Sequence, residues 1–304
     1  MTKYPEQQDE VPSNRLGIAA LVIALVALIT SVWSVVRLPS SHQNTNATSV
    51  QNIVPGLLEH TEKTGVLNAG YGVYPPYTIE DPNTKKVTGF SVDIIEQVGR
   101  ELNVKVVWHR LNWNTMSADL KRGEFDVIAD PIFETIPRAR EYAFTRPYAY
   151  FADGIAVVRK NETRFSSFDS LDKPSVTINV GQGWASESLL NARFSKAKIV
   201  PVQTSTDLLQ VFNDVLSNRA DVAVADAADA QRFVKEHPGQ VKILFLDNPP
   251  AFTPAGFALR PDDFAGAQFL TVAIRNLEAS GVLNGLAERY HVTAALQRDR
   301  TSSE

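Results

Sequence analysis

The chain has 304 residues, no cysteine and a formal net charge of −4 at pH 7. The acidic balance argues against a nucleic-acid-binding protein, which would carry a basic face. The lack of cysteine excludes disulfides, thiolate metal sites and a lipid-modified cysteine anchor. The five histidines are scattered without metal-ligand spacing, so we expect neither a metal site nor a cofactor.

An uncharged apolar run between Arg15 and Arg37 predicts one transmembrane helix over residues 16–36. As a helix this run spans roughly 30 Å, the thickness of a bilayer hydrocarbon core. A cleaved signal peptide would have a shorter apolar region, about 7–15 residues, before a small-residue cleavage site. We therefore favour an uncleaved signal anchor over a long cleaved signal or a buried soluble helix. Residues 1–15 would then be cytoplasmic, and the rest of the chain would lie on the periplasmic side of the inner membrane.

Residues 37–63 are expected to form a linker, because their first part is rich in Ser, Asn and Thr and has no hydrophobic period. From Val66 onward, short apolar runs alternate with segments of helical period, which favours α/β units around a parallel sheet. The helix expected over residues 205–219 would be capped by Ser205 or Thr206. The other expected strands and helices are 66–73, 93–102, 104–109, 114–123, 126–130, 175–181, 185–194, 198–202, 222–226, 227–237, 241–246, 263–280 and 281–291.

Two similar short strands, GIAVVRKN (154–161) and GFALRPDD (256–263), bracket a segment of about a hundred residues. A chain that leaves one lobe through one strand and returns through another has two crossings, which is how a hinge is built. A coincidental similarity between two apolar strands explains the pattern equally well.

The aromatic turn YGVYPPYTI (71–79) follows the first expected strand. Pro75 and Pro76 cannot continue a sheet, so the turn presents Tyr74 and Tyr77 at the carboxyl edge, where open α/β folds bind ligands. The alternative is a packed loop held by its aromatic rings. Asp93, at the start of the next helix, is expected to be structural.

Arg138 follows Pro137 near the expected start of a short helix. A guanidinium there could clamp a carboxylate in a bidentate way, or pair with Glu134 or Glu141. Asp226 follows the apolar strand VAVA, where it could face a cleft and accept an ammonium group, or cap the following helix.

Residues from about 64 to 292 resemble the extracytoplasmic (periplasmic) solute-binding proteins of ABC transporters for polar amino acids, family 3. Each motif is weak alone, but eight occur in the family's order at compatible spacing. They are the YPPY turn, TGFSVDI, LNW with ADLKRGEFDVI, TIPR with FTRPY, GIAVVRK, VGQG, DVLSNRADVAVAD, and GFALR with SGVLNGLAERY.

The resemblance implies a two-lobed α/β fold, the type II-like periplasmic-binding-protein fold, with two hinge strands. Lobe one would comprise 64–156 and 256–295, and lobe two 157–255, with a tail at 296–304. Arg138 would bind the ligand's α-carboxylate and Asp226 its α-ammonium. Tyr74 would stack on the ligand, and Trp113 would form a pocket wall.

The chain departs from the family where small or hydroxyl residues usually complete carboxylate recognition. Asp130, Pro131 and Phe133 stand just before TIPR, and Trp184 occupies the corresponding loop of lobe two. The ligand is therefore expected to be small and carboxylate-bearing, but not a standard neutral amino acid. Asp130 could pair with a cationic ligand group, or it could neutralise Arg138, and Phe133 and Trp184 would make the pocket aromatic.

The function expected from these residues is ligand binding without catalysis, in partnership with an ABC permease or a membrane sensor. One alternative is an enzyme like cyclohexadienyl dehydratase, with Glu134 or Asp130 as general acid or base. Another is a degenerate sensor domain, although only about fifteen residues precede the expected membrane span.

Overall fold

The computed structural model describes residues 54–204 and 207–296. The predicted membrane span 16–36, the residues before it and nearly all of the tail lie outside these ranges, as do Ser205 and Thr206. Among the helices that are described, none has the length and apolar character needed to cross a bilayer.

The sheet of lobe one has the strand order β4–β1–β5–β13–β6, and β7 also pairs with β13. Strands β1, β4 and β5 are parallel, whereas β13 runs antiparallel to β5, β6 and β7. The sheet is therefore mixed, because the chain returns through β13 in the opposite direction. The strands are β1 (Val66–Tyr71), β4 (Lys105–Arg110), β5 (Val127–Phe133), β6 (Ala143–Phe144), β7 (Ala149–Asp153) and β13 (Ala251–Leu259).

The sheet of lobe two has the order β10–β9–β11–β8–β12. Its strands β9, β10 and β11 are parallel, and β8 is antiparallel to both of its neighbours. A small separate hairpin joins β2 (Ile79–Glu80) to β3 (Val87–Thr88). The strands of lobe two are β8 (Ile155–Arg159), β9 (Thr177–Gly181), β10 (Lys198–Val202), β11 (Val222–Ala225) and β12 (Val241–Leu244).

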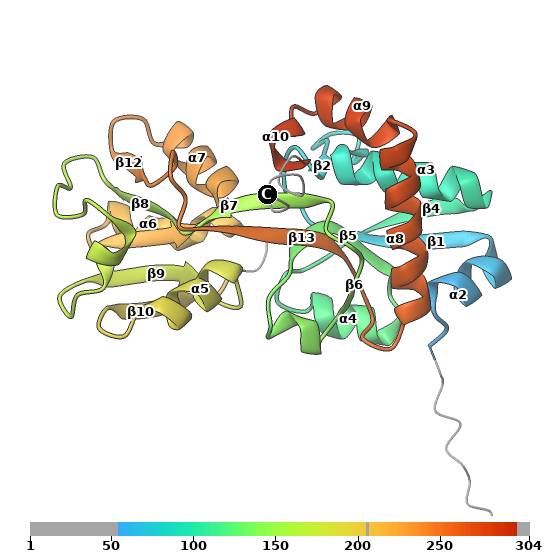
Figure 1. Cartoon of the computed structure of the whole chain (residues 1–304), viewed down its shortest axis with the longest axis horizontal. Helices are drawn as coiled ribbons and strands as arrows, with labels where there is room; N and C mark the ends of the chain where they lie inside the picture. The colour runs from blue at the N-terminus through green and yellow to red at the C-terminus, as the bar shows by residue number, and fades with distance from the viewer. Residues whose placement is uncertain (1–53, 205–206, 297–304) are drawn as a thin grey trace, which may run out of the picture. The chain divides into compact units, whose positions relative to one another are not determined.

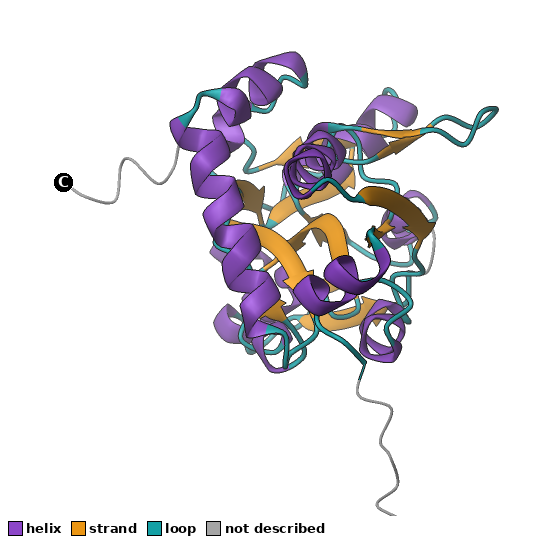
Figure 2. Ribbon diagram, turned by 90° about the vertical axis from the view of Figure 1, so that its right-hand side faces the viewer, coloured by secondary structure: helices purple, strands orange, loops and turns teal. Residues whose placement is uncertain are grey.

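Helices lie on both sides of the strands, as the view in Figure 2 shows. This arrangement gives each sheet two apolar layers, one on each face, and the buried clusters follow it. The α-helices are α2 (Leu57–Thr64), α3 (Phe90–Leu102), α4 (Met116–Arg122), α5 (Ala185–Arg193), α6 (Asn213–Leu216), α7 (Ala227–Glu236), α8 (Phe264–Ala279), α9 (Val282–Arg289) and α10 (Thr293–Leu296), and the 3-10 helices are η1 (Arg138–Arg140), η2 (Phe168–Leu171) and η3 (Leu208–Phe212).

Two antiparallel strands, β7 and β13, connect the lobes (Figure 1). Ala251 pairs with Asp153 at one end of this ribbon and Ala255 pairs with Ala149 at the other. The expectation that GIAVVRK would be a crossing strand is wrong, because β8 lies wholly within the sheet of lobe two. The segment 149–153 was missed as a strand because its aromatic sequence follows Pro147, and only pairing with the distant β13 makes it one.

The last part of the expected linker belongs to the folded unit. Leu57 is 1% exposed in the core of lobe one, and its N–H donates to Oδ2 of Asp263 at 2.7 Å. Arg260 donates to the carbonyl oxygens of Pro55 at 2.8 Å and Val54 at 2.9 Å. These contacts come from residues about 200 positions away, so local composition could not reveal them.

The helix expected over residues 205–219 is interrupted. Its first part is the 3-10 helix η3, whose cap is Asp207: the carboxylate accepts from the Leu209 N–H at 2.9 Å. The buried residues Leu208 and Val211 are three positions apart, a spacing that suits a 3-10 turn. The α-helical part, α6, begins only at Asn213.

Asp93 has the structural role expected of it, although it does not cap α3. Its Oδ2 accepts from the Tyr290 hydroxyl at 2.9 Å and from Nη1 of Arg289 at 3.2 Å, which ties α3 to the end of α9. Arg146 likewise packs within lobe one, where Nη1 pairs with Glu278 of α8 at 2.8 Å.

Candidate ligand-binding site

A pocket of about 600 Å³ opens between the two lobes. Its walls come mainly from residues that follow the carboxyl ends of parallel strands, where open α/β sheets bind ligands. Tyr74 follows β1 and Trp113 follows β4 in lobe one, while Trp184 follows β9 and Asp226 follows β11 in lobe two. Polar side chains on the walls are those of Asn114, Ser117, Gln182, Ser186, Gln203 and Thr204.

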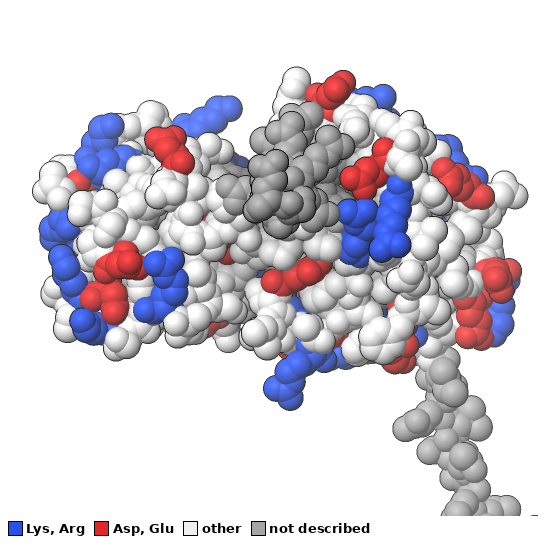
Figure 3. Space-filling view, viewed as in Figure 1, with Lys and Arg blue, Asp and Glu red and all other residues white. Residues whose placement is uncertain are grey.

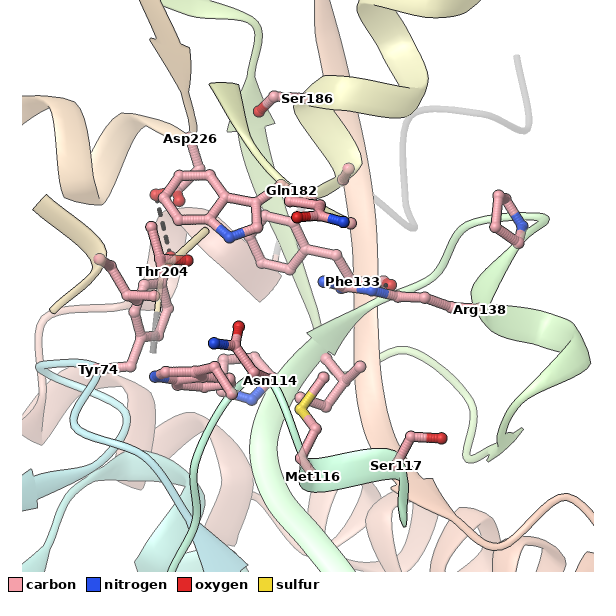
Figure 4. Close-up of a pocket in the computed structure, with 18 of the residues that line it drawn as sticks. Tyr74, Asn114, Met116, Ser117, Phe133, Arg138, Gln182, Ser186, Thr204 and Asp226 are labelled. Atoms are coloured by element: carbon pink, nitrogen blue, oxygen red, sulfur yellow. Dashed lines mark hydrogen bonds between the residues drawn. The ribbon is translucent and has the colours of Figure 1, made fainter. Parts of the chain in front are cut away.

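Arg138 points into the pocket from the side opposite Asp226 (Figure 4). The 3-10 helix η1 places it, and Nη1 donates to the carbonyl oxygen of Phe133 at 3.1 Å. The Arg138 N–H also contacts Oγ1 of Thr135 at 3.3 Å. Burial lowers the pKa of Arg138, but a guanidinium stays cationic at neutral pH. In the described part of the chain its hydrogen bond is to the Phe133 carbonyl, and Glu141 of the same pocket acts on it only through its charge, so the guanidinium can still meet an anion.

Asp226 caps the helix that follows it and also lines the pocket. It caps α7 by accepting from the N–H groups of Ala228 at 2.8 Å and Asp229 at 3.2 Å. The Tyr74 hydroxyl, from lobe one, donates to the same oxygen, Oδ1, at 3.0 Å. All three bonds end on Oδ1, so they leave Oδ2 for another donor. Burial and the charge of Asp226 raise the pKa of Tyr74, which keeps its hydroxyl a donor.

Asp130 is not among the residues that line the pocket, and the structure places its carboxylate elsewhere. It is fully buried, and its two oxygens accept from the Gly72 N–H and the Thr78 hydroxyl. Thr78 in turn accepts from the Tyr74 N–H at 3.2 Å. Asp130 therefore holds the turn that carries Tyr74, instead of meeting a ligand or Arg138. Burial raises its pKa to about 7.

Tyr77 does not reach the pocket either. It is 4% exposed, and its ring stacks on Tyr74 at a centroid distance of 5.8 Å. The ring centroid of Phe151, in β7, lies 5.0 Å from that of Tyr77 and 4.7 Å from that of Phe133. These rings form a continuous layer behind the pocket, so the packed-loop alternative holds for Tyr77 while Tyr74 reaches the ligand side.

In each lobe, one tryptophan ring packs directly against a glycine. A Cβ atom at Gly72 would overlap the ring of Trp113, and a Cβ at Gly181 would overlap the ring of Trp184. Both glycines stand at or just after the end of a strand, so the absence of a side chain lets each ring lie against the backbone and line the pocket.

Pro131 and Phe133 line the pocket as apolar surface. Pro131 offers no N–H, and the carbonyl of Phe133 is used by Arg138. The small and hydroxyl residues that usually complete carboxylate recognition are absent here. Neighbouring groups of β5 therefore do not supply the hydrogen bonds that those residues would make. The wall near Arg138 is instead completed by Ser117 and Tyr142.

The sequence did not indicate two buried acids, Asp229 and Asp153. Asp229 lines the pocket one turn after Asp226 and pairs with Arg232 at 3.1 Å. Asp153, at the end of β7, accepts from the Ser186 hydroxyl and from Thr253 Oγ1, the latter at 3.0 Å. The i, i+3 spacing after Asp226 was a usable signal for Asp229, but Asp153 could be found only through the pairing of β7.

Acidic and basic side chains are interspersed over the face shown in Figure 3. No group of three or more potential metal-ligating side chains that could hold an ion occurs in the described ranges.

Residues 67–293 match the family model of the bacterial extracellular solute-binding proteins, family 3. The match spans most of the chain. The protein belongs to this family. It is 27% identical over 232 residues to a Haemophilus influenzae protein named "Probable amino-acid ABC transporter-binding protein", a stretch that covers 76% of this chain and 86% of that one.

Two further similarities matter for function. The cyclohexadienyl dehydratase of Pseudomonas aeruginosa is 25% identical over 234 residues, covering 77% of this chain and 85% of the dehydratase. The crystal structure of an ancestral amino acid-binding protein, a precursor of cyclohexadienyl dehydratase, aligns with a TM-score of 0.65 at 27% identity, covering 78% of this chain and 99% of that one. Solute-binding family membership and the two-lobed α/β fold are thus established for this chain.

Proposed function

We propose that this protein captures a small amino-acid-like ligand between its lobes, as the membrane-anchored, extracytoplasmic receptor of an ABC transporter or a sensor. The observation that carries the proposal is the placement of opposite charges on opposite lobes. Arg138 of lobe one and Asp226 of lobe two face one pocket, and they match the carboxylate and ammonium of an amino acid. Tyr74 and the two indole rings supply flat apolar walls for the rest of the ligand.

Ligand contact with both lobes would favour a closed arrangement, with β7 and β13 as the hinge strands. Small-angle scattering of the purified soluble part should then show a smaller radius of gyration when a ligand is bound. An unchanged radius at saturating ligand would contradict hinge closure.

The binding proposal is tested by calorimetry against a panel of the standard amino acids and related carboxylates. Arg138→Ala should weaken any hit by about a hundredfold, because the ligand carboxylate loses a charge-assisted bidentate partner. Arg140→Ala, in the same 3-10 helix but on an exposed residue, is the matched control and should retain binding. Silence across the whole panel, or equal affinity in Arg138→Ala, would overturn the proposal.

The membrane anchor is a separate part of the proposal and rests on the apolar run at 16–36. Full-length protein expressed in a bacterium should stay in the membrane fraction after alkaline carbonate extraction, and mass spectrometry should find its N-terminus uncleaved. Release into the periplasm with a new N-terminus would show a cleaved signal.

A dehydratase is the second candidate, because one relative of similar length carries that name. Glu134 and Asp130, the acids expected to serve it, lie outside the pocket wall, so one of the acids that do line it, Glu141, Asp226 or Asp229, would have to act instead. Incubation of the purified protein with prephenate or arogenate decides the matter: aromatic product would establish the enzyme, and its absence leaves the binding role.

A further inference from the structure

The hinge ribbon ends, on the side of lobe two, at a buried carboxylate. Asp153 is the last residue of β7, pairs with Ala251 of β13 and is 0% exposed. The next residue, Gly154, has a φ of 79°, which other residues rarely adopt, and β8 then begins in the sheet of lobe two. Asp153 therefore stands where the chain passes from the hinge into lobe two.

Three hydrogen-bond donors meet this carboxylate. Gly154 donates its N–H to Oδ1 at 2.7 Å, and Thr253 of the second hinge strand donates its hydroxyl to Oδ2 at 3.0 Å. The Ser186 hydroxyl, in helix α5 of lobe two, also donates to Oδ1. One side chain thus connects both hinge strands with a helix of lobe two, through bonds that are stronger than those between neutral groups when the carboxylate is ionised.

A second contact joins α5 to the same end of the hinge. A Cβ atom at Gly154 would lie 2.9 Å from both Cδ2 of Leu189, in α5, and Cγ of Pro250, just before β13. The backbone of Gly154 therefore lies against α5 without room for a side chain. Ser186 and Leu189 are three residues apart, so they project from one face of α5 toward the hinge.

The start of α5 is also the part of lobe two that carries a pocket wall. Trp184 is the N-cap residue of this helix, and Ser186 lies in its first turn. Both line the pocket, although Ser186 is only 2% exposed and its hydroxyl is directed to Asp153. A shift of α5 relative to the hinge would therefore move the Trp184 wall.

The charge of Arg138, in lobe one, reaches the same carboxyl group. Burial raises the pKa of Asp153, whereas its three hydrogen bonds and the positive charge of Arg138 lower it. All of these partners favour the ionised form, which accepts hydrogen bonds only. The cation of one lobe and a helix of the other thus both act on Asp153.

We propose that Asp153 is a positioning residue for ligand binding, whose carboxylate holds helix α5 to the hinge ribbon so that Trp184 keeps its place when the lobes close. Asp153 is not among the residues that line the pocket, and it acts on the ligand through Ser186 and the start of α5. The effect on affinity rests on the function proposed above, because it needs a ligand between the lobes. The effect on the Trp184 ring does not, because the ring can be observed in the free protein.

A double-mutant cycle tests the link by calorimetry, with the twenty standard L-amino acids as probes. Asp153→Asn keeps the shape of the side chain but removes its charge, and Ser186→Ala removes the hydroxyl that reaches it. We expect each variant to weaken binding by about tenfold, and the double variant by no more than the stronger single one. Ser188→Ala, in the same helix but not among the residues that line the pocket, is the matched control and should bind as wild type does.

Additive losses in the double variant would mean that Ser186 meets the ligand by itself, and would overturn the link through Asp153. Unchanged affinity in Asp153→Asn protein that is folded, as judged by circular dichroism, would overturn it too, even if the free energy of unfolding fell. If Asp153→Asn does not fold, Thr253→Val combined with Ser186→Ala makes a second cycle on the same carboxylate, with the same expectation.

Tryptophan fluorescence of the ligand-free protein separates this proposal from the proposed function. Acrylamide should quench the Asp153→Asn and Ser186→Ala proteins more strongly than wild type, since the Trp184 ring is held less firmly. The difference should vanish in a Trp184→Phe background, and unchanged quenching would overturn the positioning role. If no amino acid binds while the quenching changes as expected, the binding function falls and the link from Asp153 to Trp184 stands.

Discussion

The hydroxyl group of Tyr74 donates a hydrogen bond of 3.0 Å to Oδ1 of Asp226, a residue 152 positions later and in the other lobe. The acceptor is a buried carboxylate, so this bond is worth more than one between neutral groups. It also joins the turn after β1 to the cap of α7, and so fixes how the two lobes meet at one side of the pocket.

Tyr74→Phe should therefore reduce the free energy of unfolding by about 1–2 kcal/mol, measured by urea denaturation. Tyr77→Phe is the control, since it removes a hydroxyl from the same turn that is not bonded to Asp226. An equal loss of unfolding free energy in the two variants would show that the hydrogen bond between the lobes does not contribute to stability.

Asp130→Asn should change how stability depends on pH. Burial raises the native pKa of Asp130 to about 7 from a reference of 3.8, so the native state binds this proton more tightly than the unfolded state. The resulting stabilisation is complete below the reference value and is lost as the pH rises through 7. Relative to wild type, the variant should gain as much as roughly 4 kcal/mol between acidic and mildly alkaline pH.

Urea denaturation of both proteins over a pH series checks this expectation. Wild type and Asp130→Asn share every other titrating group, so their difference isolates Asp130. Parallel stability curves would mean that Asp130 does not titrate in this range.

Glu134→Gln should stabilise the protein at alkaline pH. Burial raises the pKa of Glu134 to about 7, and Oε1 is buried without a hydrogen-bond partner in the part of the chain that the structure describes. The ionised form is therefore disfavoured in the native state, and its cost grows as the pH rises through 7. The melting temperature of the variant should exceed that of wild type by a few degrees at mildly alkaline pH, and by less at acidic pH.

Scanning calorimetry at two pH values gives this comparison. Glu141→Gln, on an exposed side chain nearby, should show no such pH-dependent gain. A gain of equal size at both pH values would point to packing and not to ionisation.

Gly181→Ala should displace the ring of Trp184, since the added Cβ would overlap the indole. We expect a shift in tryptophan fluorescence and a loss of ligand affinity of about tenfold or more, because the ring forms a pocket wall. Gly285→Ala is the control: nothing lies within contact of its Cβ, and the residue is in helix α9. It should leave both readouts unchanged and could add slightly to stability.

Much of the site could be predicted, because strand ends are local features and because the motifs resemble those of a known family. Arg138, Asp226, Tyr74, Trp113, Phe133 and Trp184 were named from the sequence, and the structure brings all six to one pocket. The structure places Asp130 and Tyr77 outside the pocket wall, in contacts with Gly72, Thr78 and Phe151 that local sequence did not indicate. The expected crossing at GIAVVRK was wrong, because it depended on which strand pairs with which.

The sequence by itself determined the order and type of most helices and strands, and the charged residues that follow them. These features depend on apolar periodicity, caps and turns, all of which act over a few neighbouring residues. Only the tertiary structure decided that β7 and β13 connect the lobes, and that Asp130 supports the Tyr74 turn. Those facts depend on pairing and burial between segments up to about a hundred residues apart, which no local pattern encodes.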